Sequence, residues 1–245
     1  MLERDRELSS LNECFVKALF KYRKAYNYLT SRGLTRETIE KWRLGFCPFE
    51  SSSELRGRVT IPIENARGYL VSIGGRVLPK ELSSNYNPDA PKYYNLPYSK
   101  ATTLFGLHEC LSQRGFQAVG SAVVVEDYFG VLVAYQSGFF NVVSVCGAFL
   151  TEVHLGMLLR ETDIIAVAFD PDEGGEKGWE RVKEMSEKYQ YPIYKLSLEK
   201  DLDEILLADK AWFQNALSNL VLSFPGVSRE EELRGRLRRL SDGEG

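Results

Sequence analysis

The sequence predicts an α/β protein with two parts: an α+β N-terminal subdomain, and then a mostly parallel four-stranded sheet flanked by helices. Three observations carry this prediction. Residues 1–50 are helical in period, residues 56–108 contain short strand-like runs, and from about residue 117 strand-like and helix-like segments alternate. Such alternation is typical of a parallel sheet covered by helices. At 245 residues, 44% of them hydrophobic, the chain is long enough for two cores.

The N-terminal elements follow from apolar spacing and turn residues. The apolar positions that recur every three or four residues are Ala18, Leu19, Tyr22, Tyr26 and Leu29. Gly33 is expected to end this helix, and Thr35 to begin the next. Two short strands, at 59–63 and 69–73, then flank a turn, and Gly74-Gly75 is expected to form a turn before Arg76.

The second part is predicted to contain four strands, at 119–125, 141–145, 164–169 and about 192–198. The first of these is an almost unbroken apolar run, as expected of a strand buried on both faces. Helices are expected at 129–136, at 151–159 with Thr151 as N-cap, and at about 176–188. The Gly174-Gly175 pair is expected to bend the chain before the last of these helices. The predicted domains are 1–108, 109–204 and a short helical segment at 205–245.

Charge is divided unevenly along the chain. Residues 1–108 hold 17 Lys and Arg against 11 Asp and Glu, whereas residues 109–245 hold 14 against 23, which together give the net charge of -3. A basic first part could hold a phosphate backbone, and an acidic second part could hold divalent cations. Solvated surface charge explains the counts equally well. The four cysteines form no C-x-x-C pair, so we expect buried thiols and no zinc.

Three carboxylates follow the predicted central strands: Glu126 comes after 119–125, and Asp170 and Asp172 come after 164–169. In an open parallel sheet, ligands gather at the carboxyl ends of the strands. Carboxylate oxygens suit Mg²⁺. An Asp-x-Asp pair alone is a weak signal, because Asp also caps helices. With Glu126 ending another strand, the pattern predicts a metal site.

These segments resemble a known family. Residues 123–132 (VVVEDYFGVL), the Gly147 loop and residues 164–174 (IIAVAFDPDEG) are similar to the Toprim domain of DnaG-type primases, topoisomerases and some nucleases. Upstream, the segments that resemble the N-terminal subdomain of the bacterial primase catalytic core are 28–39, 44–46, 56–63, 74–76 and 92–97. Topoisomerases and small nucleases lack that subdomain. The resemblance runs from about residue 15 to residue 206 and is specific to primases.

The resemblance implies an enzyme that makes RNA primers on DNA with two Mg²⁺ or Mn²⁺ ions. Glu126, Asp170 and Asp172 would hold the metal and act in catalysis together with Lys92 and Lys100. The residues expected to bind template and nucleotide phosphates are Arg56, Arg58, Arg76, Lys92, Asn95 and Lys100. The further candidate metal ligands are Asp127, Asp201 and Asp203, of which the last two could instead cap a helix. The implied partners are single-stranded DNA, ribonucleoside triphosphates and an RNA–DNA hybrid.

The chain departs from the family in one loop. The family pattern Glu-Gly-Tyr-x-Asp is replaced by Glu126-Asp127-Tyr128-Phe129-Gly130, as if Gly and Asp had exchanged places. Either Asp127 supplies the carboxylate that is absent at Gly130, or that ligand is lost. Asp at position 127 would also strain a turn that needed a positive φ.

Three functions remain open at this stage: a primase, a Toprim nuclease, and a catalytically weakened, primase-derived module that binds nucleic acid. The family's zinc-binding and helicase-binding domains have no counterpart, which indicates either a minimal primase that works with a replicative helicase or a separate zinc-domain protein, or a fragment of a longer primase. No apolar run is long enough for a membrane span, so we expect a cytoplasmic protein of a bacterial or phage-infected cell that does not bind membranes. The two histidines, His108 and His154, are expected to be neither ligands nor bases.

Overall fold

A four-stranded antiparallel sheet organises the first of two structural units. The computed structural model describes residues 2–83, 87–147 and 149–223, and the chain divides into Met1–Ser99 and Lys100–Gly245. The sheet of the first unit has the order β1-β2-β3-β4. Its strands are β1 (Gly45–Phe46), β2 (Arg58–Glu64), β3 (Leu70–Val77) and β4 (Tyr93–Asn95). The strands expected at 59–63 and 69–73 are therefore confirmed, and each is longer than predicted.

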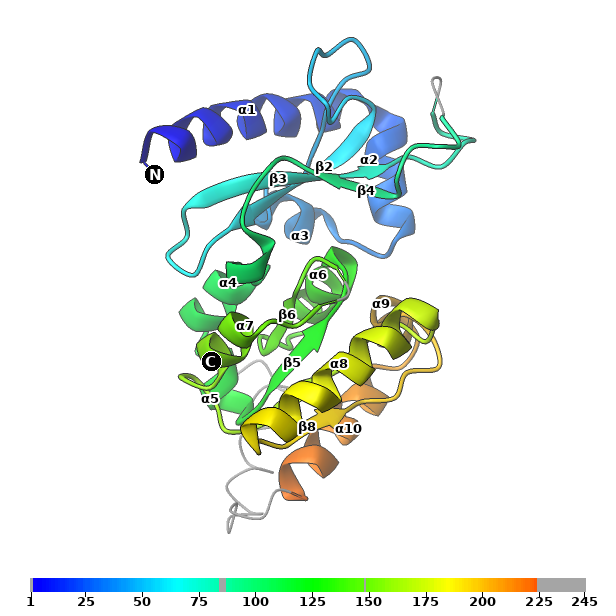
Figure 1. The fold of residues 1–245 in the computed structure, drawn as a ribbon. Coiled ribbons are helices and arrows are strands. Elements are labelled where there is room, and N and C mark those ends of the chain that lie inside the picture. Colours follow the sequence, from blue (N-terminus) through cyan, green and yellow to red (C-terminus); the bar gives the residue numbers. More distant parts are fainter. Residues whose placement is uncertain (1, 84–86, 148, 224–245) are drawn as a thin grey trace. The chain divides into compact units, whose positions relative to one another are not determined.

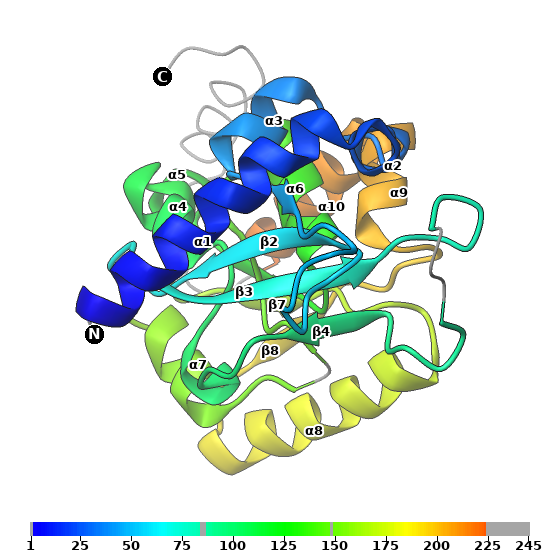
Figure 2. The same ribbon diagram turned by 90° about the horizontal axis from the view of Figure 1, so that it is seen from above.

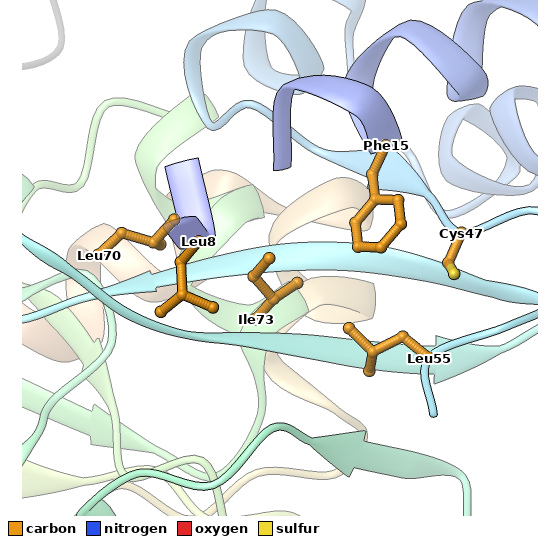
Figure 3. Packing of buried hydrophobic residues seen from close by; sticks show 6 residues of the cluster. All are labelled: Leu8, Phe15, Cys47, Leu55, Leu70 and Ile73. Atoms are coloured by element: carbon orange, nitrogen blue, oxygen red, sulfur yellow. The ribbon is translucent and has the colours of Figure 1, made fainter. Parts of the chain in front are cut away.

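Helix α1 (Leu2–Lys21) covers one face of this sheet (Figures 1 and 2). Leu8 and Phe15 of the helix pack with Ile73 of β3 in a buried cluster that also contains Leu70, Cys47 and Leu55 (Figure 3). Burial of apolar surface of this kind is the main force that holds a helix on a sheet. The first unit thus has a core of its own.

Two shorter helices follow α1. The chain breaks at Tyr22, so the single helix expected through Leu29 is instead α1 and α2 (Arg23–Ser31). Gly33 has a φ of 81°, which suits its predicted role as a stop. The helix expected to begin at Thr35 is α3 (Arg36–Lys41), and Thr35 is its N-cap, with a side chain that accepts a hydrogen bond from Thr38 N.

The second unit contains a four-stranded parallel sheet of order β6-β5-β7-β8. Its strands are β5 (Ala122–Val125), β6 (Val142–Ser144), β7 (Ile165–Val167) and β8 (Ile193–Lys195). The predicted α/β fold class is confirmed. The helices are α4 (Leu107–Ser112), α5 (Gly115–Val119), α6 (Tyr128–Gln136), α7 (Glu152–Leu158), α8 (Glu173–Tyr189), α9 (Leu202–Ala208) and α10 (Lys210–Leu222), with a 3₁₀ turn η1 (Lys100–Thr102).

Helices lie on both faces of this sheet. Helices α7 and α8 lie on one side, and α6, α9 and α10 lie on the other (Figure 2). Leu220 and Val221 of α10 pack against Ile164 and Ala166 in a buried cluster. Covering both faces explains why residues 122–125 are apolar without alternation.

Several boundaries differ from the predicted ones. Val119 ends helix α5 rather than starting a strand, because Gly120, with a φ of 81°, reverses the chain before β5. The division between units falls at Ser99, ahead of residue 108, since Phe105 pairs with Ser144 at the end of β6. Cys14 is exposed, whereas the other three cysteines are buried as expected. The end of the predicted C-terminal segment, 224–245, lies outside the described residues.

Candidate active site

Glu126 and Asp170 lie at the carboxyl edge of the parallel sheet. Glu126 directly follows β5, and Asp170 follows the neighbouring strand β7. The chain passes from β5 to β6 on one side and then to β7 on the other, so this edge is the topological switch point where open sheets bind ligands. The Glu126 Oε1 atom accepts a hydrogen bond from Asp170 N at 3.2 Å. The two predicted residues are therefore brought together.

The backbone around Glu126 is firmly held. Its carbonyl oxygen accepts hydrogen bonds from Ser144 Oγ at 2.9 Å and from Gly147 N at 3.0 Å. Both donors come from the end of β6 and the loop after it. The carboxylate thus extends from a backbone that is fixed to the end of β6 and the loop after it.

Negative charge accumulates at this edge. The pKa of Glu126 is raised to about 7, mainly by burial and in smaller part by the carboxylates of Asp172, Asp127 and Asp201. Burial likewise raises the pKa of Asp170 to about 7, with Asp201 the largest of the contributing carboxylates. Like charges that disfavour one another's ionised form are a common feature of functional sites.

Gly175 is the residue that makes this close packing possible. A Cβ atom at position 175 would lie 2.0 Å from Asp170 O and 2.9 Å from Glu126 Oε1. The predicted bend before the helix is wrong, because Gly174 and Gly175 form the first turn of α8, which begins at Glu173. The glycine is needed for the approach of helix and carboxylates.

Asp127 and Asp172 have matching positions at helix starts. Asp127 caps α6 and accepts from Gly130 N at 3.0 Å, and Asp172 caps α8 and accepts from Gly175 N at 2.9 Å. Asp127 has a φ of −114°, so the backbone strain expected there is absent. Each aspartate thus offers one oxygen to its helix, and its charge still contributes to the site.

The donor set suits a hard divalent cation. Within residues 2–83, 87–147 and 149–223, no three His, Cys, Asp or Glu side chains converge in a metal-binding arrangement. The carboxylates nevertheless raise one another's pKa, and a divalent cation would relieve that repulsion. Asp201 is the N-cap residue of α9, and Asp203 is buried in that helix's first turn. The residues present therefore fit Mg²⁺ or Mn²⁺.

The predicted basic residues of the first unit divide into buried and exposed ones. Arg58 and Arg76 are buried. Arg58 Nη1 donates to Pro91 O at 2.9 Å, and Arg76 donates to the hydroxyls of Tyr28 and Tyr93, with its guanidinium 4.9 Å from the Tyr93 ring centre. These arginines therefore hold the residues on either side of Lys92.

The remaining residues of the first unit that were predicted to bind phosphates are Lys92, Arg56 and Asn95. Lys92 is exposed, and Asn95 lies on β4 opposite Gly74. Arg56 lines a cavity of about 650 Å³ together with Phe49 and Arg58. The predicted turn at Gly74-Gly75 is wrong, since both lie within β3. A Cβ at Gly75 would lie 2.9 Å from Arg58 Cδ, so the glycine gives the arginine room.

Lys100 belongs to the second unit, where it begins η1. Its Nζ donates to Cys146 O at 3.4 Å. Sequence reasoning missed Cys146, His154 and Gly175 as contributors to this site. A positive φ at a non-glycine residue, such as the 53° of Cys146, cannot be recognised from residue type.

Comparison with known proteins gives the family. The Toprim domain family matches residues 120–197. A DNA primase of Legionella pneumophila is 29% identical over 212 residues, which cover 73% of this chain and 35% of that protein. A DNA primase domain from Pseudomonas aeruginosa superposes with a TM-score of 0.74 at 25% identity and covers 98% of this chain and 96% of that one. The chain contains a Toprim domain and is similar to the catalytic core of DnaG-type primases.

Other relatives agree with this assignment. A DNA primase of Rickettsia felis is 31% identical over 185 residues, 62% of this chain and 29% of that protein. The primase of Aquifex aeolicus, solved with its zinc-binding and RNA polymerase domains, superposes with a TM-score of 0.75 at 25% identity and covers 98% of this chain and 68% of that one. The chain spans about a third of the length of the curated relatives it matches. In the described part of the chain, no helix is both long and apolar enough to cross a membrane.

Proposed function

We propose that this chain is a primase core that synthesises short RNA primers on single-stranded DNA. The observation that carries the proposal is the pair of half-buried carboxylates, Glu126 and Asp170, at the switch point of a Toprim sheet. A related DnaG catalytic domain, 24% identical with a TM-score of 0.72, was solved bound to single-stranded DNA. That structure supports single-stranded DNA as the template class.

The carboxylates would hold divalent metal. Glu126, Asp170 and Asp172 are the proposed ligands, with Asp127 and Asp201 adding negative charge and Asp203 as a further candidate. When bound, two such cations activate an attacking 3'-hydroxyl and neutralise charge on the transferred phosphoryl group. The protein's own contribution is to fix these oxygens on strand ends and helix caps, so that little rearrangement is needed when nucleotide enters.

The exposed cations would bind phosphate. Lys92 is held in place by its neighbours Pro91 and Tyr93, which Arg58 and Arg76 contact. Lys92, Arg56 and Lys100 are the residues we expect to meet template or nucleotide phosphates. A ribonucleoside triphosphate needs such partners because its charge would otherwise be repelled by the carboxylates.

One assay tests the proposal. The protein is incubated with single-stranded DNA, ribonucleotides and Mg²⁺ or Mn²⁺, and products are sized on a denaturing gel. We expect short RNA that disappears in Asp170→Ala and Lys92→Ala but remains in Glu184→Gln, an exposed change on α8. Cleavage of the template would instead indicate a nuclease.

A second candidate function is binding without synthesis. The observation that favours it is Gly130, where the family pattern has a carboxylate, together with the engagement of Asp127 in capping α6. In that case the protein would bind single-stranded DNA but yield no RNA under any metal condition, even with a helicase or zinc-domain protein added.

A further inference from the structure

His154 lies at the start of α7 and uses both of its ring nitrogens. It is 1% exposed. Thr151 N donates to its Nδ1 at 3.3 Å, so Nδ1 carries no proton. The ring proton therefore lies on Nε2, which donates to Lys100 O at 2.9 Å. Burial lowers the pKa of His154, in keeping with this neutral form.

The same helix start holds the rest of the η1 turn. Thr151 Oγ1 accepts from His154 N at 3.2 Å, which completes a capping box, and it donates to Ala101 O at 2.8 Å. Thr103 N also donates to Lys100 O, at 3.3 Å. Consecutive carbonyls of η1 are thus fixed to α7 by two side chains, Thr151 and His154.

From that turn, the Lys100 side chain reaches the site. Its Nζ donates to the carbonyl of Cys146, and the N–H of the same peptide group, that of Gly147, donates to Glu126 O at 3.0 Å. A single peptide group therefore links the ammonium of Lys100 to the backbone of the carboxylate that we expect to hold metal. Movement of η1 would displace the ammonium relative to Glu126.

We propose that His154 is a positioning residue: through its Nε2 contact with Lys100 O, it places the Lys100 ammonium where it meets the phosphates of the incoming nucleotide. This inference rests on the proposed primase function. A structural role of His154 in the core predicts that any substitution would act through stability. A positioning role predicts that the effect depends on which ring nitrogen is retained.

Two amide variants separate these roles. In His154→Gln the amide nitrogen can take the place of Nε2 and keep the contact with Lys100 O. In His154→Asn the amide oxygen can take the place of Nδ1 and keep the capping box, but the side chain is too short to reach Lys100 O. The two variants bury similar polar groups, so each is a matched control for the other.

Steady-state RNA synthesis is measured as a function of nucleotide concentration. We expect Lys100→Ala to raise the KM for nucleotides about tenfold, the effect of losing one charged hydrogen bond. His154→Asn should raise KM by several-fold with a smaller effect on kcat, while His154→Gln stays within about twofold of wild type. Adding His154→Asn to Lys100→Ala should change KM no further. Equal effects of Asn and Gln, or full additivity with Lys100→Ala, would overturn the proposal.

Amide hydrogen exchange tests the positioning step without catalysis. Faster exchange at Thr103 in His154→Asn, but not in His154→Gln, is expected if His154 fixes η1. Unchanged exchange in both variants would overturn the role of His154. Absence of RNA product from wild type would overturn the primase function alone, because the exchange result still decides whether His154 fixes the turn. A normal KM in Lys100→Ala would overturn the proposal by removing the residue through which His154 acts.

Discussion

Replacing Glu126 by Gln is expected to stabilise the protein at neutral and alkaline pH while abolishing RNA synthesis. The variant keeps an oxygen that can accept the hydrogen bond of Asp170 N, which is 3.2 Å from Oε1 in wild type. It removes one charge from an edge where burial and neighbouring carboxylates raise the pKa of Glu126 to about 7. The folded protein therefore disfavours the ionised form of Glu126 relative to the unfolded chain.

The size of the effect follows from the pKa. The ordinary value is 4.5 and the folded value is about 7, a difference of about 2.5. Each pKa unit corresponds to about 1.4 kcal/mol, so the upper bound is roughly 3.5 kcal/mol. Glu126 is only half-buried, and water screens its charge, which reduces the expected gain to about 1–2 kcal/mol, or roughly 2–8 °C in Tm.

The direction with pH is fixed by the sign of the shift. Because the folded protein binds the proton of Glu126 more tightly than the unfolded chain does, wild-type stability falls as pH rises from about 4.5 to about 7. The penalty is fully present above that window and absent below it. The variant has no such penalty, so its advantage over wild type should be near zero at pH 4.5 and largest at pH 8.

Urea unfolding at pH 4.5, 6 and 8 without divalent metal measures this difference. Glu184→Gln, an exposed change on α8, should show no comparable pH-dependent gain. Millimolar Mg²⁺ should stabilise wild type at pH 8 more than it stabilises Glu126→Gln, because the variant has lost a ligand charge. A gain that is equal at all three pH values, or a loss of stability at pH 8, would refute the argument from charge repulsion.

Three further changes test other parts of the site. Gly175→Ala should destabilise the protein by about 2 kcal/mol or more and remove activity, because its Cβ would overlap Asp170 O. The control is Gly156→Ala on α7, where the new Cβ would have no atom within 4 Å apart from its chain neighbours and the backbone of its own helix, and thermal unfolding measures both. Asp127→Ala should cost about 1 kcal/mol through loss of the α6 cap, whereas Asp127→Asn keeps the cap. The double variant Asp127→Asn with Gly130→Asp should give more RNA than wild type, and less RNA than wild type would mean that Asp127 supplies the missing ligand. Arg58→Met should weaken binding of single-stranded DNA, because Arg58 holds Pro91 next to Lys92. In a Lys92→Ala background, the same change should leave the slope of log binding constant against log salt concentration unchanged, and a slope lower by about 0.7 would show direct phosphate contact by Arg58.

The sequence predicted those elements whose signals are local. The helix start at Thr35 and the N-cap at Thr151 are as expected, because a threonine before a helical segment satisfies free backbone donors within three residues. The break at Tyr22 was missed because no Gly or Pro marks it, and the reversal at Gly120 was missed because apolar residues lie on both sides of that glycine. Apolar residues such as Val119 fit a helix end and a buried strand equally well.

The sequence predicted which carboxylates lie at the candidate site better than it predicted the contacts that hold them there. Glu126 and Asp170 could be found because strand ends at a switch point follow from topology, and topology follows from alternating segments. The role of Gly175 could not be found from the sequence. It depends on the start of α8 approaching both Asp170 O and the carboxylate of Glu126, which lies 44 positions before Asp170, and only the folded sheet creates that approach. The same holds for His154, whose partner Lys100 is 54 residues away in sequence.

Several charged residues that we expect to bind metal or phosphate also form hydrogen bonds with the backbone. Asp127 and Asp172 each accept a backbone N–H, Glu126 accepts the N–H of Asp170, and Arg58 donates to the Pro91 carbonyl. Residue type predicts a metal or phosphate partner for each, and the fold gives each a structural partner as well. Loss of function in a variant therefore does not by itself identify a ligand contact, because a displaced neighbour would have the same effect. Paired variants such as the isosteric Asp127→Asn and the truncating Asp127→Ala separate the two causes, since the amide retains the contact with the backbone and removes only the charge that a cation would bind.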